Sequence, residues 1–85
     1  MINTYNIVIE KRAQKFIRKQ NRDVQQKILK AISKLPNFGD IKKLEGYKEK
    51  IYRLRVNDIR IIYTVDHSEL IVTIIDADSR GQVYK

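Results

Sequence analysis

The chain has 85 residues, a length that favours a single domain over residues 1–85 with a small core. With no cysteine and one histidine, it lacks the ligands for a disulfide framework or a structural zinc site. Its hydrophobic residues, 42% of the chain, form no run long enough to span a bilayer, and its first residues lack a signal-peptide pattern. We therefore expect a cytoplasmic protein with no membrane partner.

The net charge of +8 is concentrated in the first part of the chain. Residues 1–50 contain 13 basic and 5 acidic residues, whereas residues 51–85 contain 5 of each and use arginine at four of their five basic positions. Such an excess is typical of proteins that bind a polyanion, such as nucleic acid, a ribosome or an acidic protein. Solubility alone is the simpler alternative.

The first half of the chain predicts one strand and two helices. Alternating apolar residues at 5–9 predict a strand. Apolar residues at helical spacing predict helices over 10–20 and 24–35, with Asn21 as a cap or break between them. The segment 36–40, which contains proline and glycine, ends the second helix, and the charged segment 41–50 is interpreted as a connection.

Three segments rich in β-branched and aromatic residues follow, at 51–56, 59–65 and 70–76, separated by turn residues at 57–58 and 66–68. A further short piece lies around 83–84. The order β-α-α-β-β-β indicates an α+β fold, a small and mostly antiparallel sheet with the two N-terminal helices packed on one face. The pattern leaves open where the first strand joins the sheet.

Strand periodicity places three arginines together. If residues 57–58 form a two-residue turn, Val56 pairs with Ile59 and Arg55 with Arg60, so that Arg53, Arg55 and Arg60 share one face. The alternate residues, at positions 52, 54, 56, 59, 61, 63 and 65, form an apolar face for the helices. Because like charges directly opposite each other destabilise a sheet, we interpret the arginines as a phosphate clamp, although exposure to water would also tolerate them.

Two further residues, Arg80 and Tyr84, follow the last long strand. The chain resembles the RelE/ParE superfamily of toxins, and within it the RelE-like branch. Four segments carry the resemblance: KLEG at 43–46, YRLRV at 52–56, RIIY at 60–63, and RGQVY at 80–84, which contains Arg80 and Tyr84. The similarity extends over nearly the whole chain, and the order and spacing of the four segments carry it.

The resemblance implies a toxin of a type II toxin–antitoxin system that inhibits translation. In RelE-like members this means metal-independent cleavage of mRNA in the ribosomal A site, where the ribose 2′-hydroxyl attacks the adjacent phosphate. The implied partners are a cognate antitoxin, the ribosome with its A-site mRNA, and operator DNA only through the antitoxin. No cofactor is implied.

Carried over position by position, the catalytic residues implied are Arg53, Arg55, Arg60, Arg80 and Tyr84. Arg53 and Arg55 stand where well-known RelE members have lysines, Arg60 and Arg80 match arginines that hold the scissile phosphate, and Tyr84 matches a tyrosine that stacks on a base. Because arginine does not readily accept a proton at neutral pH, the general base is left open among Lys50, Asp76, Asp78 and water.

The remaining charged residues support weaker hypotheses. Basic residues on the helices and the connection are candidate contacts to RNA or the ribosome, or simply a solvated surface; they are Lys11, Lys15, Arg18, Lys19, Lys27, Lys30, Lys42 and Lys43. His67 is interpreted as a turn residue. Asp76 and Asp78 form an acidic strand end, too few ligands for a metal site.

Three functions remain open from the sequence. The first is the ribosome-dependent endoribonuclease, which the combined presence of the arginines and the tyrosine favours. The second is a ParE-like toxin of the same fold that inhibits DNA gyrase. The third is a non-catalytic module that binds RNA or protein on this scaffold.

Overall fold

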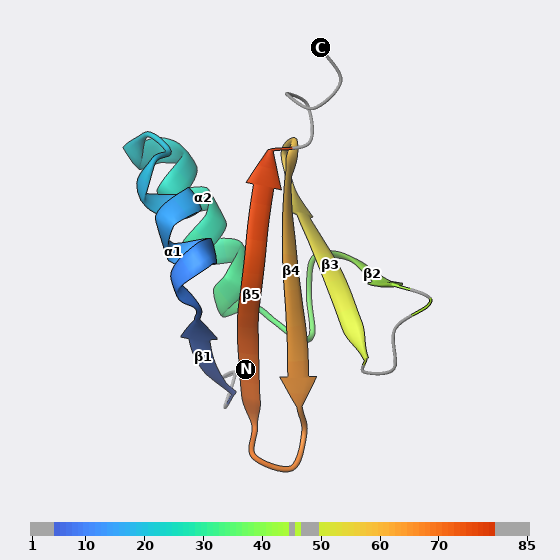
Figure 1. Ribbon diagram of the computed structural model, residues 1–85. Helices are drawn as coiled ribbons and strands as arrows, with labels where there is room; N and C mark the ends of the chain where they lie inside the picture. The colour runs from blue at the N-terminus through green and yellow to red at the C-terminus, as the bar shows by residue number, and fades with distance from the viewer. Residues whose placement is uncertain (1–4, 45, 47–49, 80–85) are drawn as a thin grey trace.

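One mixed sheet carries both helices on a single face (Figure 1). The computed structural model describes residues 5–44, 46 and 50–79. Their elements in chain order are β1 (Asn6–Ile9), α1 (Lys11–Arg18), α2 (Arg22–Ser33), β2 (Asp40–Leu44), β3 (Ile51–Val56), β4 (Ile59–Asp66) and β5 (Ile71–Ser79). The predicted α+β class, with two helices on a mostly antiparallel sheet, is confirmed.

The strand order across the sheet is β1-β5-β4-β3-β2. β1 pairs in parallel with β5, and every other neighbouring pair is antiparallel. The sequence pattern left open where the first strand joins the sheet. In the structure, β1 is an edge strand and lies next to β5, the last strand. Neither helix in the described part of the chain is long and apolar enough to cross a lipid bilayer.

One prediction about the elements was wrong. The segment 41–50 was expected to be a connection, but its first part belongs to β2, which pairs with β3. Gly39 introduces this strand with a φ of 133°, and a Cβ at that position would lie 2.6 Å from Leu54 Cδ1. The positive φ, which L side chains rarely adopt, therefore favours glycine here, and a Cβ would also displace the Leu54 side chain.

The helices are positioned by a cap and by the core. Asn21 Oδ1 accepts a hydrogen bond of 2.9 Å from the backbone N–H of Val24, which confirms Asn21 as the cap of α2. Apolar side chains from both layers then form one buried cluster. The helices and the segment after α2 contribute Ala13, Ile17, Ile28, Ile32 and Leu35, and the sheet contributes Leu54, Ile59, Ile61, Tyr63, Val72, Ile74 and Ala77.

Tyr63 is the largest fully buried side chain, with 1% of its surface exposed. Its ring stacks on that of Tyr52, with 5.5 Å between centroids. Burial, and secondarily the neighbouring Tyr52, raises the pKa of Tyr63 from 10.0 to about 12. Burial therefore favours the protonated phenol over the phenolate in the folded protein.

We predict that this phenol makes the protein less stable at alkaline pH. Between pH 10 and about 12 the folded Tyr63 keeps a proton that the unfolded chain has lost. The free energy of unfolding should therefore fall by about 1.4 kcal/mol per pH unit in this window through Tyr63 alone. Urea unfolding of the wild type and of Tyr63→Phe across this range would measure the difference, and a difference that does not change with pH would contradict the prediction.

Candidate functional site: an arginine-lined hollow on the open sheet face

The face of the sheet turned away from the helices carries the three arginines of the sheet, in the register predicted from the sequence. Val56 lies opposite Ile59, Arg55 opposite Arg60, and Arg53 opposite Ile62. The two-residue turn that fixes this register has Asn57 in the left-handed conformation with a φ of 57°, which asparagine tolerates better than most residues. The predicted pairing is therefore confirmed.

Arg53 and Arg60 line an open hollow of about 610 Å³ on this face. Arg12 of α1 and Lys42 of β2 bring two more cations to it. The rest of the lining consists of Leu44, Ile51, Ile62, Ile75, Asp76 and Asp78. Arg55 lies on the same face but is exposed, one alternate position nearer the β3–β4 turn than Arg53. Four cations and two carboxylates thus surround one concavity.

An extra residue in β5 brings the carboxylates to this face. Opposite the consecutive residues Ile62 and Tyr63 of β4 lie Asp76 and Ile74, so that Ile75 is a bulge. Ile74 and Ala77 are both buried although their sequence numbers differ by three, which would place them on opposite faces of a regular strand. If alternation continued regularly from Ile74 through Ile75, Asp76 and Asp78 would turn toward the helices. The bulge instead aligns Asp78 with Arg60 and Asp76 with Ile62.

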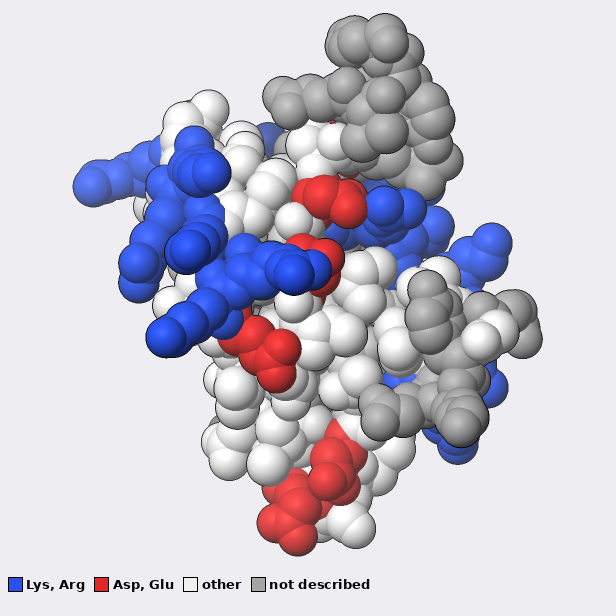
Figure 2. Space-filling view, viewed as in Figure 1, with Lys and Arg blue, Asp and Glu red and all other residues white. Residues whose placement is uncertain are grey.

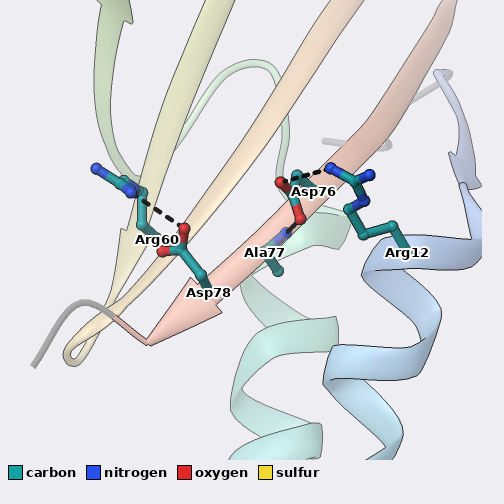
Figure 3. A network of polar contacts seen from close by, with 5 residues as sticks. All are labelled: Arg12, Arg60, Asp76, Ala77 and Asp78. Atoms are coloured by element: carbon teal, nitrogen blue, oxygen red, sulfur yellow. Dashed lines mark hydrogen bonds and ion pairs between the residues drawn. The ribbon is translucent and has the colours of Figure 1, made fainter. Parts of the chain in front are cut away.

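Three ion pairs tie the cations to carboxylates. Arg60 Nη2 donates to Asp78 Oδ2 at 3.0 Å, and Arg12 Nη1 lies 3.7 Å from Asp76 Oδ2 (Figure 3). Arg53 Nη2 lies 3.6 Å from Asp40 Oδ1. Pairs this exposed contribute little to stability, typically below about 1 kcal/mol each. These ion pairs instead orient the side chains, because they hold the guanidinium groups at the hollow.

The Arg53 guanidinium has donor capacity left. Its side chain is 16% exposed, and its Nε is buried without a hydrogen-bond partner within the described residues. That nitrogen has no surface that a ligand in the hollow could reach. The donors that Arg53 can offer to a phosphate oxygen are therefore those of its Nη groups, at the end of the guanidinium that lines the hollow.

The predicted RNA-binding residues separate into groups. Lys11, Lys15 and Lys19 line a second hollow of about 410 Å³ along α1, together with Arg12, Phe16 and Ala77. Figure 2 shows Lys and Arg gathered over the helices and, on the other side, toward β3 and β2, with acidic side chains between the two groups. Lys42 lines the first hollow, whereas Lys43 pairs with Tyr52 and lies on the opposite face. The remaining three, Arg18, Lys27 and Lys30, are exposed and lie outside both hollows.

The other candidates lie elsewhere. Arg80 and Tyr84 are outside the described residues. His67 lies in the β4–β5 turn, where its Nδ1 is 2.7 Å from the Tyr5 hydroxyl, and it does not line either hollow. Lys50 is exposed just before β3. Within the described part of the chain, no group of three or more His, Asp or Glu side chains is arranged to hold a metal ion.

Sequence reasoning missed Arg12 and Asp40 as members of this site. Arg12 belongs to a helix, and only the packing of α1 against β5 brings it beside Asp76. Asp40 was placed in the segment that ends the second helix, although it begins β2 and faces Arg53. The alternation Asp76-Ala77-Asp78 after two apolar residues was a usable signal, because a regular strand would have buried both carboxylates.

Comparison with known proteins identifies the scaffold. Residues 7–84 match the family model described as the ParE toxin of the type II toxin–antitoxin system parDE. The chain belongs to this family. It is thereby a type II toxin of the RelE/ParE superfamily, as its sequence motifs indicated. A search of curated proteins gave no match.

Solved structures share the fold over nearly the whole chain. The chain is similar to one in the archaeal RelE–RelB complex from Pyrococcus horikoshii, with 27% identity, a TM-score of 0.77, and 93% of this chain and 98% of that chain covered. It is also similar to the isolated RelE toxin of E. coli, with 24% identity, a TM-score of 0.73, and 95% and 92% covered. The RelBE2 complex of Mycobacterium tuberculosis gives 19% identity, a TM-score of 0.75, and 89% and 98% covered.

We predict that single-residue deletions in β5 show how the bulge determines which residues of this strand face the helices and which face the hollow. Deleting Ile75 should leave Ala77 inward and Asp78 outward, so the free energy of unfolding should change by less than about 2 kcal/mol. Deleting Ala77 should force a carboxylate toward the helices and lower it by about 3 kcal/mol or more. Urea unfolding of both variants checks this, and equal losses would refute the role of the bulge.

Proposed function

We propose that this toxin is a ribosome-dependent mRNA endoribonuclease that cuts without a metal ion. The observation that carries the proposal is the convergence of Arg53 and Arg60, from adjacent strands, on one hollow that Arg12 and Lys42 also line. Planar guanidinium groups with forked donors suit phosphate oxygens and the charge that develops on them during phosphoryl transfer. A hollow of this composition fits a nucleic acid backbone better than an apolar ligand.

The proposed reaction uses the RNA itself as the nucleophile. The ribose 2′-hydroxyl gives its proton to water, and its oxygen bonds to the adjacent phosphorus as the bond from phosphorus to the 5′-oxygen breaks. The 5′-oxygen takes up a proton, and a 2′,3′-cyclic phosphate remains. Arg60 and Arg53 hold the non-bridging phosphate oxygens and stabilise their increased charge. Arg55 beside the hollow, and Arg80 and Tyr84 near the end of the chain, take the roles that the family resemblance gives them.

Charge in the hollow is only partly compensated. Arg60 and Arg53 each have a carboxylate neighbour, whereas Lys42 has no ion pair within the described residues. A phosphate must therefore compete with Asp78 and Asp40, which favours a substrate held at several points over a single phosphate. The lysines along α1 supply such additional contacts, and we assign them to ribosomal or messenger RNA.

The proposed protein partner is a cognate antitoxin. RelE chains in the archaeal and mycobacterial structures were crystallised with RelB-type partners. An antitoxin of this kind would neutralise the toxin and link it to operator DNA indirectly.

A second candidate is inhibition of DNA gyrase. The observation in its favour is that the matching family model describes a ParE toxin. A gyrase inhibitor does not require a phosphate-binding hollow, so the arginines separate the two functions. A non-catalytic binding module would use the same face without chemistry.

One experiment decides among the three. The protein is expressed from a controlled promoter, and both mRNA 5′ ends and DNA breaks are mapped across the genome. Cuts phased with codons in translated mRNA support the endoribonuclease. Gyrase-linked DNA breaks without such cuts support the second function, and the absence of both supports the third.

We predict that Arg60→Ala lowers mRNA cleavage by about 100-fold or more, because one preformed donor to transition-state charge is lost. Arg22→Ala is the matched control, since Arg22 is an exposed arginine on the first turn of α2, outside both hollows. Primer extension on a translated reporter measures the cuts, and urea unfolding verifies that both variants fold. Wild-type cleavage by Arg60→Ala would remove Arg60 from the mechanism.

A further inference from the structure

The hollow is lined by more hydrogen-bond donors than acceptors. Arg12, Lys42, Arg53 and Arg60 present hydrogen-bond donors only. Among the described residues of the lining, the side chains that can accept are the carboxylates of Asp76 and Asp78. A ligand that offers both an anion and a hydroxyl therefore has two residues to choose from for the hydroxyl.

The two carboxylates differ in their free capacity. Asp76 Oδ1 accepts from the backbone N–H of Ala77 at 2.8 Å, and its Oδ2 faces Arg12 at 3.7 Å, so both oxygens are engaged. Asp78 contacts Arg60 through Oδ2, and its Oδ1 is buried with no hydrogen-bond partner within the described residues. A carboxylate offers about four acceptor positions. Asp78 thus has the larger unused capacity, and because Oδ1 is buried, a ligand in the hollow reaches this carboxylate at the oxygen that contacts Arg60, on a side chain that is 43% exposed.

The position of Asp78 relative to Arg60 matches a ribonucleotide. The acceptor and the donor are 3.0 Å apart and directly opposite each other in the ladder. In ribose, the 2′-hydroxyl and the 3′-phosphate stand on neighbouring carbons. Carboxylates are well suited to read a ribose 2′-hydroxyl, and this hydroxyl is what distinguishes RNA from DNA.

We propose that Asp78 is the residue that recognises the 2′-hydroxyl of the nucleotide whose 3′-phosphate Arg60 binds, and that it thereby selects RNA over DNA at this site. The inference rests on the phosphate-binding role given to Arg60 under the proposed function. The β5 bulge is the structural device that supplies Asp78, because it turns the residue out of the core and opposite Arg60.

The test uses small probes that contain only the two groups concerned. Adenosine 3′-monophosphate and 2′-deoxyadenosine 3′-monophosphate are titrated into the full-length protein, and the dissociation constants are measured by NMR. The wild type should bind the ribonucleotide at least about tenfold more tightly than the deoxyribonucleotide, the expected effect of a hydrogen bond to a charged acceptor. In Asp78→Ala this ratio should fall to about one.

The ratio separates recognition from general electrostatics. Removing Asp78 also removes repulsion of the phosphate, but that change affects both probes equally and cancels in the ratio. Asp76→Ala is the matched control, because it removes the same charge from the same hollow and should leave the ratio unchanged. If Asp78→Ala does not fold, Asp78→Asn takes its place and should lower the ratio at least twofold.

An absence of discrimination by the wild type, or an unchanged ratio in the Asp78 variant, overturns the inference. Loss of the ratio in Asp76→Ala instead would also overturn it. The proposed function is judged separately, from wild-type cuts in translated mRNA. Cuts with an unchanged ratio leave the endoribonuclease standing without this role for Asp78, whereas loss of the ratio without any cuts leaves a ribonucleotide site without the proposed activity.

Discussion

The extra residue in β5 is the constraint on which the site depends. This strand has to supply Val72, Ile74 and Ala77 to the core and, within the same few residues, carboxylates to the opposite face. Strict alternation cannot satisfy both demands, because Ile74, Asp76 and Asp78 would then share one side. The bulge at Ile75 reverses which face of the sheet the following residues occupy, and it lies just after Ile74, where the pairing with β1 ends.

The carboxylates in turn make the arginine arrangement tolerable. Arg55 and Arg60 lie directly opposite each other, which destabilises a ladder by repulsion. Asp78 holds Arg60 from the β5 side, and Asp40 lies opposite Arg55 while contacting Arg53 on the β2 side. Each acid therefore stands on the outer flank of the cationic pair. The face retains an excess of cations for a polyanion, while Arg53 and Arg60 each keep a carboxylate neighbour.

Part of this arrangement could be read from the sequence because local rules determine it. Apolar alternation and the turn at Asn57 fix the β3–β4 register, and a side-chain cap fixes the start of α2. β2 was missed because its pattern Asp-Ile-Lys-Lys-Leu has only two apolar residues, and it becomes a strand by pairing with β3. The parallel pairing of β1 and the position of Arg12 depend on contacts between segments far apart in the chain, which no local pattern encodes.

The site's chemistry follows from the difference between arginine and lysine. A lysine can lose its proton and act as a base, whereas arginine at Arg53 and Arg55 stays charged and can only donate. With arginine at both positions, β3 offers a phosphate permanently charged donors and no proton acceptor there. Hydrogen-bond acceptors beside the arginines include the carboxylates of β5. Membership of the family accounts for the scaffold. The proposed preference for a ribose phosphate rests instead on donors from β3 and β4 and acceptors from β5 lying side by side, since a ribose phosphate offers both an acceptor and a donor.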